Sequence, residues 1–510
     1  MNSKPYDLLV IGGGVNGVSI ARDAAGRGLS VLLCEMGDLG GATSSASSKM
    51  IHGGLRYLEH YAFRLVAKAL REREVLLASA PHIVRPMRFV LPHVPALRPV
   101  WMIRVGLWLY DRLGGRRRLA PSCKIRLPGS EFATGLRPGL ETGFVYSDCW
   151  VDDARLVALA AVDAARLGAE VLPRTRCGKA RRAGDVWQAE LATENGSRTV
   201  TARVLVNAAG PWVEQVVAEV AGDNTPAGLR LIKGSHIVVG RRITGDHALI
   251  LQNDDGRVIF VLPYEQDSTL IGTTDVPFEG DPAKVAISGD EIDYLCRAAS
   301  RYLAEPVTPD QVVWQYSGVR PLYDDGEGDP SDVTRDYVLT LDGEDGRPPL
   351  LSIFGGKITT ARVLAETVLE RLAPFLPGLA PEWTATAVLP GGDIGDFDRF
   401  LDDLADRFTG FERRWLAGLA RRHGSRAGDI LDGATGPSDL GKDFGGGLYA
   451  REVDWLIDHE WAREPSDVLW RRTKLGLRLS EAEQGALSRY MARILSGKSL
   501  NTDSTPQSVS

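Results

Sequence analysis

A stretch near the amino terminus, Tyr6 to Glu35, constrains the fold more than any other part of the chain. It begins with an apolar run of the kind expected for a parallel strand covered on both faces. Gly12, Gly14 and Gly17 then form the pattern G-x-G-x-x-G. In this pattern the glycines permit a tight turn, the approach of a pyrophosphate to the backbone and the close packing of a helix. Glu35 ends the next apolar run, where a carboxylate accepts hydrogen bonds from a ribose. The stretch predicts a dinucleotide site; the alternative is that its glycines serve packing alone.

The glycine pattern does not distinguish NAD from FAD, because Glu35 suits the adenosine ribose of either cofactor. A later region favours FAD. Residues 187–193 alternate in polarity, Asn195-Gly196 predicts a hairpin turn, and residues 200–206 return as a strand. That strand ends in a second glycine turn, NAAGPW, which opens a helix. An added hairpin before such a turn is typical of FAD-binding folds of the glutathione-reductase type, so we expect FAD.

Length, charge and cysteine content narrow the class of protein. A chain of 510 residues is too long for one core, and we expect two or three domains. The net charge of −6 argues against a protein that binds nucleic acid through bulk electrostatics. The five cysteines show no metal-type spacing, so we expect no metal site. None follows Cys296, which argues against a cysteine-ligated iron–sulfur cluster near the carboxyl end.

The first ten residues, MNSKPYDLLV, lack the apolar stretch of a signal peptide. No apolar run in the chain approaches the ~20 residues of a membrane-spanning helix. We therefore expect a protein of the cytosol, either dissolved or bound to a membrane surface.

A dense hydroxyl cluster, residues 43–48, follows the first nucleotide-binding unit. It is either an exposed loop with a helix cap or a set of donors around phosphate and flavin. Lys49 and His52 come next, and after a glycine pair Arg56 and Tyr57 would point toward the ligand.

The middle of the chain has a period of two from residue 230 to 275, which predicts an antiparallel sheet as the floor of a substrate domain. His236 and Thr274 lie near strand ends in this region. Further on, YSGVRPL places Arg320 on a predicted glycine–proline turn. A last glycine turn, FGGKITT, carries Lys357 and opens a helix whose positive end would stabilise negative charge on a reduced flavin.

Residues 98–118 predict a helix, with Trp101, Val105 and Trp108 at helical spacing and Arg116–Arg118 just after. Aromatic side chains beside a basic cluster suit a helix that lies in the headgroup region of an anionic membrane. A helix packed on a neighbouring domain, with a solvated basic turn, fits the same pattern equally well.

The predicted fold class is α/β, with a glutathione-reductase-type FAD-binding Rossmann domain, an antiparallel-sheet substrate domain and a C-terminal helical domain. We expect the FAD-binding domain to combine residues 1–80, 150–220 and 335–380. The substrate domain would combine residues 81–149 and 221–334. Residues 389–498 would form the helical domain, and 499–510 a disordered tail.

Several stretches together resemble one known family. They are IGGGVNGVSIARDAAGRGLSVLLCE, ATSSASSKMIHGGLRYLEHYAFRLV, YSDCWVDDARL, NAAGPWV, RLIKGSHIVV, IGTTD, YSGVRPL, FGGKITTAR and LWRRTKLGL. In this order, and over nearly the whole chain, they are similar to the FAD-dependent glycerol-3-phosphate dehydrogenases, above all the aerobic, membrane-associated bacterial members. One departure is Gly41, where the bacterial sequence carries cysteine.

The resemblance implies oxidation of sn-glycerol 3-phosphate to dihydroxyacetone phosphate, with electrons passing through FAD to membrane quinone. It also implies a homodimer that is peripheral on the inner face of the cytoplasmic membrane. Substrate contacts are expected at Arg56, Tyr57, His236, Thr274, Arg320 and Lys357.

The expected substrate residues match the chemistry of this reaction. A phosphate dianion needs fixed cations, and Arg56, Arg320 and Lys357 supply three. The alcohol proton needs a base, for which His236 is the candidate and Lys357 the alternative. The residues expected to contact FAD are Gly12, Gly14, Val15, Asn16, Gly17, Glu35, Thr43, Ser44, Ser45, Ser48, Lys49, His52, Gly53, Gly54, Leu55, Cys177, Ala209, Gly210, Trp212, Gly356, Lys357 and Thr359.

Three other functions fit parts of the pattern. An oxidase of the same fold would pass electrons to oxygen, with glycerol 3-phosphate or an amine as substrate. A non-catalytic flavoprotein or membrane-docked scaffold would bind glycerol 3-phosphate without turnover, which leaves the set of His236, Arg320 and Lys357 unexplained. An NAD-dependent dehydrogenase would leave the NAAGPW and FGGKITT turns without a role.

Overall fold

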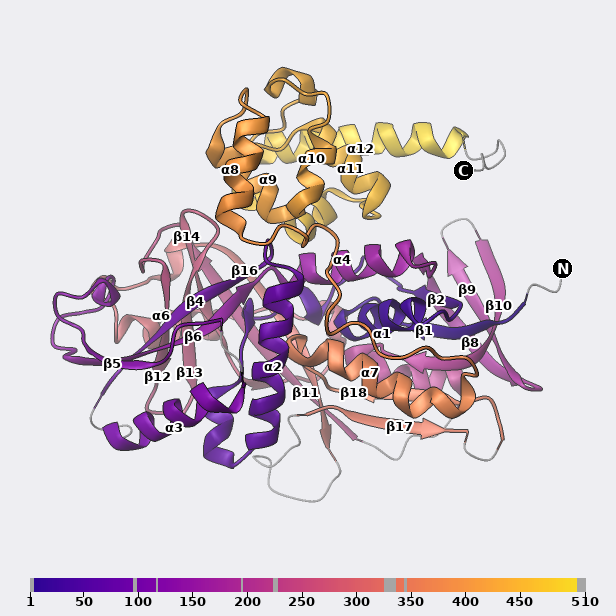
Figure 1. The fold of residues 1–510 in the computed structure, drawn as a ribbon, viewed down its shortest axis with the longest axis horizontal. Coiled ribbons are helices and arrows are strands. Elements are labelled where there is room, and N and C mark those ends of the chain that lie inside the picture. The colour runs from indigo at the N-terminus through magenta and orange to yellow at the C-terminus, as the bar shows by residue number, and fades with distance from the viewer. Residues whose placement is uncertain are drawn as a thin grey trace. The chain divides into compact units, whose positions relative to one another are not determined.

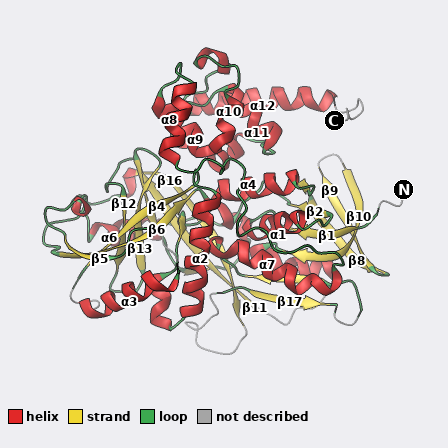
Figure 2. Cartoon of the chain, in the orientation of Figure 1, coloured by secondary structure: helices red, strands yellow, loops and turns green. Residues whose placement is uncertain are grey.

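The structure of the chain is a computed structural model that describes residues 4–94, 99–115, 118–193, 196–222, 228–324, 336–343 and 346–501 (Figure 1, Figure 2). The predicted hairpin residue Asn195, the basic residues Arg116 and Arg117, and the predicted tail from residue 502 lie outside this range. The chain divides into two compact units, residues 1–389 and 390–510.

The strands are β1 (Tyr6–Ile11), β2 (Val31–Cys34), β3 (Met50–Ile51), β4 (Val84–Pro92), β5 (Cys123–Arg126), β6 (Thr142–Val151), β7 (Glu170–Leu172), β8 (Arg176–Ala183), β9 (Val186–Thr193), β10 (Gly196–Asn207), β11 (Gly228–Val239), β12 (His247–Gln252), β13 (Val258–Tyr264), β14 (Ser268–Gly272), β15 (Val276–Pro277), β16 (Val312–Asp324), β17 (Val338–Asp342) and β18 (Leu350–Phe354). The α-helices are α1 (Val15–Gly26), α2 (Phe63–Ser79), α3 (Val100–Leu113), α4 (Asp153–Arg166), α5 (Val213–Gln215), α6 (Gly289–Ser300), α7 (Ala361–Leu372), α8 (Phe397–Arg407), α9 (Arg413–His423), α10 (Ala427–Ile430), α11 (Ala450–His459) and α12 (Glu481–Asn501).

The first sheet of the amino-terminal unit is the predicted nucleotide-binding sheet. Its strand order is β17-β18-β10-β1-β2-β7; the strands β18, β10, β1, β2 and β7 are parallel to one another, and β17 is antiparallel to β18. Helix α1 packs against α4 and α7 beside these strands (Figure 1). The antiparallel strands β8 and β9 join β10 as the added layer that the alternating residues predicted. A strand covered on both faces must be apolar throughout, which explains the continuous apolar run in β1.

Residues 170–177 of this sheet do not form one continuous strand. The structure has two strands, β7 and β8, separated by a turn in which Arg174 has a φ of +53°. The backbone N–H groups of Arg174 and Thr175 donate to the carbonyl oxygens of Gly37 and Glu35. The turn therefore supports the loop that follows β2.

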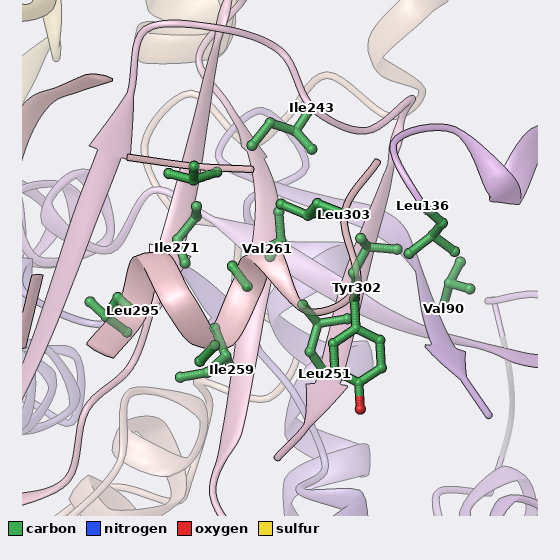
Figure 3. Close-up of a cluster of buried hydrophobic side chains, with 14 of the residues drawn as sticks. Val90, Leu136, Ile243, Leu251, Ile259, Val261, Ile271, Leu295, Tyr302 and Leu303 are labelled. Atoms are coloured by element: carbon green, nitrogen blue, oxygen red, sulfur yellow. The ribbon is translucent and has the colours of Figure 1, made fainter. Parts of the chain in front are cut away.

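The second sheet of this unit contains ten strands and is mostly antiparallel, as predicted. Its core combines apolar residues of β12, β13 and β14, such as Val261, with Leu295 of α6 and with Tyr302 and Leu303 just beyond that helix (Figure 3). Helix α6 starts at a capping box in which the Ser288 hydroxyl and the Glu291 carboxylate bond to each other's backbone N–H groups. The cap fixes where α6 begins beneath the sheet.

The predicted turn at Arg320 is wrong. Arg320 lies inside the 13-residue strand β16, opposite Ile232 of β11. The strand tolerates Pro321 because β16 pairs with β11 alone, so that a missing N–H on its other side breaks no ladder. The sequence GVRP predicted a turn because glycine and proline favour turns locally, whereas the long register with β11 decides the structure.

The carboxyl-terminal unit is helical, as the sequence predicts, with two apolar clusters. One is formed by residues from Leu401 to Leu440 and the other by residues from Phe444 to Met491. Helix α12 continues to Asn501, past the start of the predicted tail. Among the described residues of the whole chain, no helix is long and apolar enough to span a membrane.

A buried ionic cluster joins α9 to α11 in this unit. Glu452 accepts hydrogen bonds from Arg422 at 2.7 and 2.9 Å, and its Oε1 lies 2.9 Å from His423 Nε2. Burial alone would raise the pKa of Glu452, but the Arg422 guanidinium and the His423 ring outweigh it and lower that pKa to about 2. Since the pKa is below its ordinary value, the cluster stabilises the fold above pH 4.5 and loses this contribution as the pH falls toward 2.

Replacing Glu452 by glutamine is expected to destabilise the carboxyl-terminal unit by about 3–5 kcal/mol at pH 7, because it leaves a buried guanidinium without its anion. Calorimetric unfolding of the full chain measures this change, with Glu481→Gln on the exposed start of α12 as the matched control. An unfolding temperature equal to that of the control variant would contradict the stabilising role of the cluster.

Candidate active site

The loops predicted to bind the dinucleotide meet at one edge of the first sheet. Strands β1, β2, β10 and β18 are parallel, so the residues that follow each of them lie at the same edge. These residues are Gly12, Glu35, Ala208 and Gly355. Ligands of open parallel sheets bind at the carboxyl ends of the strands, which places the site here.

The glycine turn after β1 has the geometry that its motif requires. Gly12 has a φ of +112°, and a Cβ at this position would lie 2.5 Å from the carbonyl oxygen of Ala208. A Cβ on Gly17 would lie 1.9 Å from the carbonyl oxygen of Gly12, so only glycine permits α1 to pack this close to the turn. The motif is therefore a functional turn that leads into the amino terminus of α1.

Glu35 is held by the backbone at the end of β2. Its carboxylate accepts hydrogen bonds from the N–H groups of Gly13 and Gly37, both at 2.7 Å. Burial raises the pKa of Glu35, and these two donors oppose that shift. The carboxylate is thus fixed beside the glycine turn, where it has further lone pairs for ribose hydroxyls.

The hydroxyl cluster wraps the amino terminus of α1 and touches the second sheet. Ser44 Oγ accepts a hydrogen bond from the N–H of Val15 at 2.9 Å, where a phosphate would bind. Thr43 Oγ1 donates to the carbonyl oxygen of Val319 in β16 at 2.7 Å. Ser45 Oγ bonds locally to the carbonyl oxygen of Ala42. The loop joins the cofactor edge to the substrate sheet.

Lys49 corrects one expectation. Its ammonium is fully buried, lies 2.7 and 2.8 Å from the two carboxylate oxygens of Asp153, and donates to the carbonyl oxygen of Ser45. The ammonium is therefore bound by protein groups and anchors the loop. Its partner lies 104 residues away in the chain, which no local pattern indicates.

The FGGKITT turn contributes an unpaired buried cation. Asn16 Nδ2 donates to the carbonyl oxygen of Gly355, which ties the turn to α1. Lys357 Nζ lies 4.1 Å from the centre of the Tyr57 ring. Among the described residues, this buried ammonium and the buried Asn16 Oδ1 have no hydrogen-bond partner. Buried polar atoms without partners indicate groups that a ligand would satisfy.

His236, the predicted base, is buried on β11. Its Nε2 lies 2.8 Å from Ser48 Oγ, and its ring stacks on Tyr316 with a centroid distance of 4.8 Å. A Cβ on Gly272 would lie 2.1 Å from His236 Cδ2, so the glycine makes room for the ring. Burial, together with the cations of Lys49 and Arg320, lowers the pKa of His236 well below 6.5. The ring is therefore neutral, as a base must be.

Arg320 reaches the same region from β16. Its Nη2 donates to the carbonyl oxygen of Thr274 at 3.1 Å and pairs with Asp275 at 3.2 Å. The carbonyl oxygen of Pro321 would be 3.5 Å from a Cβ on Gly355, which brings Arg320 next to the turn that carries Lys357. Arg320 thus acts on His236, and the residue after it lies beside the turn that carries Lys357.

Thr274 corrects a second expectation. Its hydroxyl donates to Glu291 at 2.8 Å and accepts the N–H of Ser235 at 2.9 Å, and the residue is buried. Glu291 also receives Ser235 Oγ and pairs with Lys233. The Thr274 side chain therefore stabilises its loop through hydrogen bonds to Ser235 and Glu291. Its backbone carbonyl oxygen accepts a hydrogen bond from Arg320.

The remaining predicted residues lie at the edges of the site. Arg56 and Tyr57 belong to a 3₁₀ helix, Leu55–His60, that follows Gly54 with its φ of +75°. Burial and the Lys357 cation lower the pKa of His52, whose N–H lies 3.4 Å from Thr359 Oγ1.

The turn after β10 contains Ala209, Gly210 and Trp212, with a φ of +56° at Gly210. Cys177 lies on β8 in the core of the first sheet, together with Cys34. The side chains of Lys49 and Thr274 are paired with the buried carboxylates of Asp153 and Glu291.

Tyr316 and Glu291 are the residues that sequence reasoning missed. Tyr316 donates to the carbonyl oxygen of Ser47, and Glu291 accepts from Ser235, so each has a partner on a distant element. The motif YSGVRPL contained Tyr316 without indicating its stacking partner.

Two family profiles match the chain, one in each of its two parts. The FAD dependent oxidoreductase profile matches residues 7–362, and the profile of the C-terminal domain of alpha-glycerophosphate oxidase matches residues 383–503. The chain is 53% identical to a glycerol-3-phosphate dehydrogenase of Pseudomonas aeruginosa, over 96% of this chain and 95% of that protein. The chain belongs to the FAD-dependent glycerol-3-phosphate dehydrogenase family.

Members of the family share the fold as well as the sequence. A glycerol-3-phosphate dehydrogenase from Bacillus halodurans, complexed with FAD, superposes with a TM-score of 0.74 at 26% identity, covering 97% of this chain and 95% of that one. The chain is also 50% identical to a D-erythritol 1-phosphate dehydrogenase of Brucella abortus, over 94% of this chain and 96% of that protein. The family thus includes more than one phosphorylated polyol as substrate.

The residues at the sheet edge fit FAD. The crowded glycine turn, the fixed Glu35 carboxylate, and the unpartnered Asn16 Oδ1 and Lys357 Nζ provide a phosphate turn, a ribose acceptor and two polar atoms that need partners. The chain is therefore an FAD-dependent oxidoreductase of this family.

Proposed function

We propose that the chain oxidises sn-glycerol 3-phosphate to dihydroxyacetone phosphate and passes the electrons to membrane quinone. The observation that carries this proposal is the buried, unpartnered ammonium of Lys357 in a region that also contains Arg320 and the neutral His236. A phosphate monoester needs the cations, and an alcohol that loses a proton needs the neutral base.

In the proposed mechanism the chain's own residues bind and deprotonate the substrate. Arg56, Arg320 and Lys357 bind the phosphate group and the other oxygen atoms of the substrate. The Tyr57 ring lies against the Lys357 ammonium. His236 takes the proton of the C2 hydroxyl, because its lowered pKa keeps a lone pair available at neutral pH. When bound, FAD supplies the hydride acceptor at its N5 atom.

The substrate is tested by steady-state assay of the purified holoenzyme with an artificial dye as acceptor. We expect dihydroxyacetone phosphate as product and a kcat/KM for sn-glycerol 3-phosphate at least about tenfold above that for D-erythritol 1-phosphate. The reverse preference would identify D-erythritol 1-phosphate as the substrate. No turnover with either compound would favour the binding scaffold.

Membrane quinone is the proposed acceptor because the exposed face of α3 suits a bilayer surface. Trp101, Val105 and Trp108 are 68%, 50% and 53% exposed, whereas Ile103, Leu107 and Tyr110 of the same helix are buried. The exposed Tyr61 and Phe63 lie on the neighbouring elements that α3 contacts. Arg112 stacks 4.2 Å from the centre of the Trp108 ring. Exposed aromatic rings beside arginines are typical of helices in the headgroup region.

Replacing both Trp101 and Trp108 by serine is expected to weaken binding to anionic liposomes by more than about tenfold, because each buried indole contributes ~25 cal/mol per Å². Dye-linked activity should be unchanged, since both rings are exposed and neither is a predicted site residue. Co-sedimentation with vesicles of phosphatidylglycerol measures the effect. Val313→Ser, at another exposed apolar residue, is the control. Undiminished sedimentation of the double variant would contradict the proposal that α3 binds a membrane surface.

The acceptor is distinguished from oxygen by reoxidation of the reduced holoenzyme. We expect fast recovery of the flavin absorption with a quinone analogue and slow recovery with dissolved oxygen. Fast recovery with oxygen would identify an oxidase instead.

The proposed assignment of domains and assembly follows the expected roles. Residues 1–80, 150–220 and 335–380 would bind FAD, residues 81–149 and 221–334 would bind substrate, and residues 389–498 would form the helical domain. The active form would be a homodimer at the inner face of the cytoplasmic membrane. Size-exclusion chromatography with light scattering tests the dimer.

A further inference from the structure

The surroundings of His236 determine which ring nitrogen is available for chemistry. Ser48 Oγ lies 2.8 Å from Nε2, and the Tyr316 ring covers one face of the imidazole. Gly272 lies against the ring edge that contains Cδ2 and Nε2. Nδ1 is buried and has no hydrogen-bond partner among the described residues. Nε2 is thus held by the protein, and Nδ1 is the nitrogen left for a ligand.

A neutral imidazole carries its proton on only one of these two nitrogens. If Nδ1 carried the proton, a buried donor would have no acceptor and the ring would present no lone pair to a substrate hydroxyl. If Nε2 carries the proton, Ser48 Oγ accepts it and Nδ1 presents a lone pair. The second arrangement satisfies the donor and leaves a base.

We propose that Ser48 is a positioning residue that accepts the Nε2 proton of His236 and so directs the Nδ1 lone pair at the substrate hydroxyl. The assignment rests on the proposed function, because it concerns the base of that reaction. In the step, the O–H bond of the substrate breaks, its proton forms a bond to Nδ1, and the ring becomes an imidazolium that still donates from Nε2 to Ser48. The carbon-bound hydrogen would leave with its two electrons as hydride, for which bound FAD would supply the acceptor.

The segment that contains Ser48 holds the imidazole from two sides. Tyr316, which stacks on His236, donates its hydroxyl proton to the carbonyl oxygen of Ser47 at 2.8 Å. The Lys49 ammonium lies 4.7 Å from the centre of the same tyrosine ring, and Asp153 fixes that ammonium. Residues 47–49 therefore set both the plane of the imidazole and the partner of its Nε2. This gives the buried ion pair between Lys49 and Asp153 a role in holding the Tyr316 ring.

The test compares Ser48→Ala with Ser48→Thr in the FAD-loaded enzyme. For Ser48→Ala we expect the first-order rate of flavin reduction by sn-glycerol 3-phosphate to fall roughly 10- to 100-fold. The substrate dissociation constant should change less than about twofold, because the cations remain. The rate is measured on the flavin-loaded fraction, since Ser48 is also an expected FAD contact. Ser48→Thr keeps the hydroxyl and should restore most of the rate. An unchanged rate in Ser48→Ala, or loss of flavin with a normal rate in the loaded fraction, would overturn the proposal.

A second readout does not depend on activity. With ¹⁵N-labelled histidine, the His236 signals are identified by their absence in His236→Asn, and the chemical shifts of the two ring nitrogens report which one carries the proton. We expect protonated Nε2 and bare Nδ1 in the wild type, and a mixture of tautomers in Ser48→Ala. Protonated Nδ1 in the wild type would refute the assignment. If the wild-type flavin is not reduced by the substrate at all, the proposed function fails, while the tautomer still decides the role of Ser48.

Discussion

The substitution His236→Ala is expected to lower kcat for sn-glycerol 3-phosphate by about 10²- to 10⁴-fold, the range that a general base contributes. KM should change little, because the proposed phosphate contacts come from Arg56, Arg320 and Lys357. Steady-state assay of the flavin-loaded variant measures both constants. Tyr264→Phe, at a buried tyrosine on β13 two strands away in the same sheet, serves as a packing control. An unchanged kcat would exclude His236 as the base and favour Lys357.

The pH dependence of the reaction follows from the same residue. The pKa of His236 lies well below 6.5, because burial and the cations of Lys49 and Arg320 disfavour its protonated form. The neutral ring is the base, so the acid-side decline of kcat/KM should begin only at a pH below 6.5. The same decline should be missing from the residual activity of His236→Ala.

The substitution Arg320→Ala is expected to raise KM for sn-glycerol 3-phosphate by about 10- to 100-fold, since a hydrogen bond to a charged group contributes about 1.5–3 kcal/mol. Flavin content should be unchanged, because Arg320 lies on β16 and bonds to Thr274 and Asp275. Removing this cation should also raise the pKa of His236 and move the acid-side decline to higher pH.

Two controls distinguish loss of phosphate binding from loss of structure. Arg320→Lys keeps the charge without the planar guanidinium, and we expect an intermediate KM. Arg301→Ala removes an arginine that forms an exposed ion pair with Asp254, and KM should not change. If Arg320→Ala keeps the wild-type KM, the phosphate is held by other residues.

Local patterns predicted the parts of the site that depend on neighbours in the chain. The glycine turn after β1, the carboxylate after β2 and the FGGKITT turn each follow a strand within a few residues, so their place at the sheet edge follows from strand order and backbone sterics. FAD was predicted from the hairpin before the second glycine turn, and the family from the resemblance of several motifs; the comparisons confirm both.

Contacts between distant segments could not be predicted from one sequence. The ammonium of Lys49 was expected at the ligand, but it pairs with Asp153 across 104 residues. Thr274 was expected to bind substrate, but its hydroxyl donates a hydrogen bond to Glu291, which is part of the capping box of α6. Arg320 was placed on a turn, because the register of β16 with β11 has no local signal. Each error has one cause: a long-range partner overrides a local preference.

The most direct test of the account is anaerobic mixing of the purified holoenzyme with sn-glycerol 3-phosphate, following the flavin absorption near ~450 nm. The account predicts rapid bleaching with formation of one equivalent of dihydroxyacetone phosphate per flavin. Persistent absorption at saturating substrate, in protein that retains its flavin, would contradict the assigned substrate and with it the roles of His236, Arg320 and Lys357.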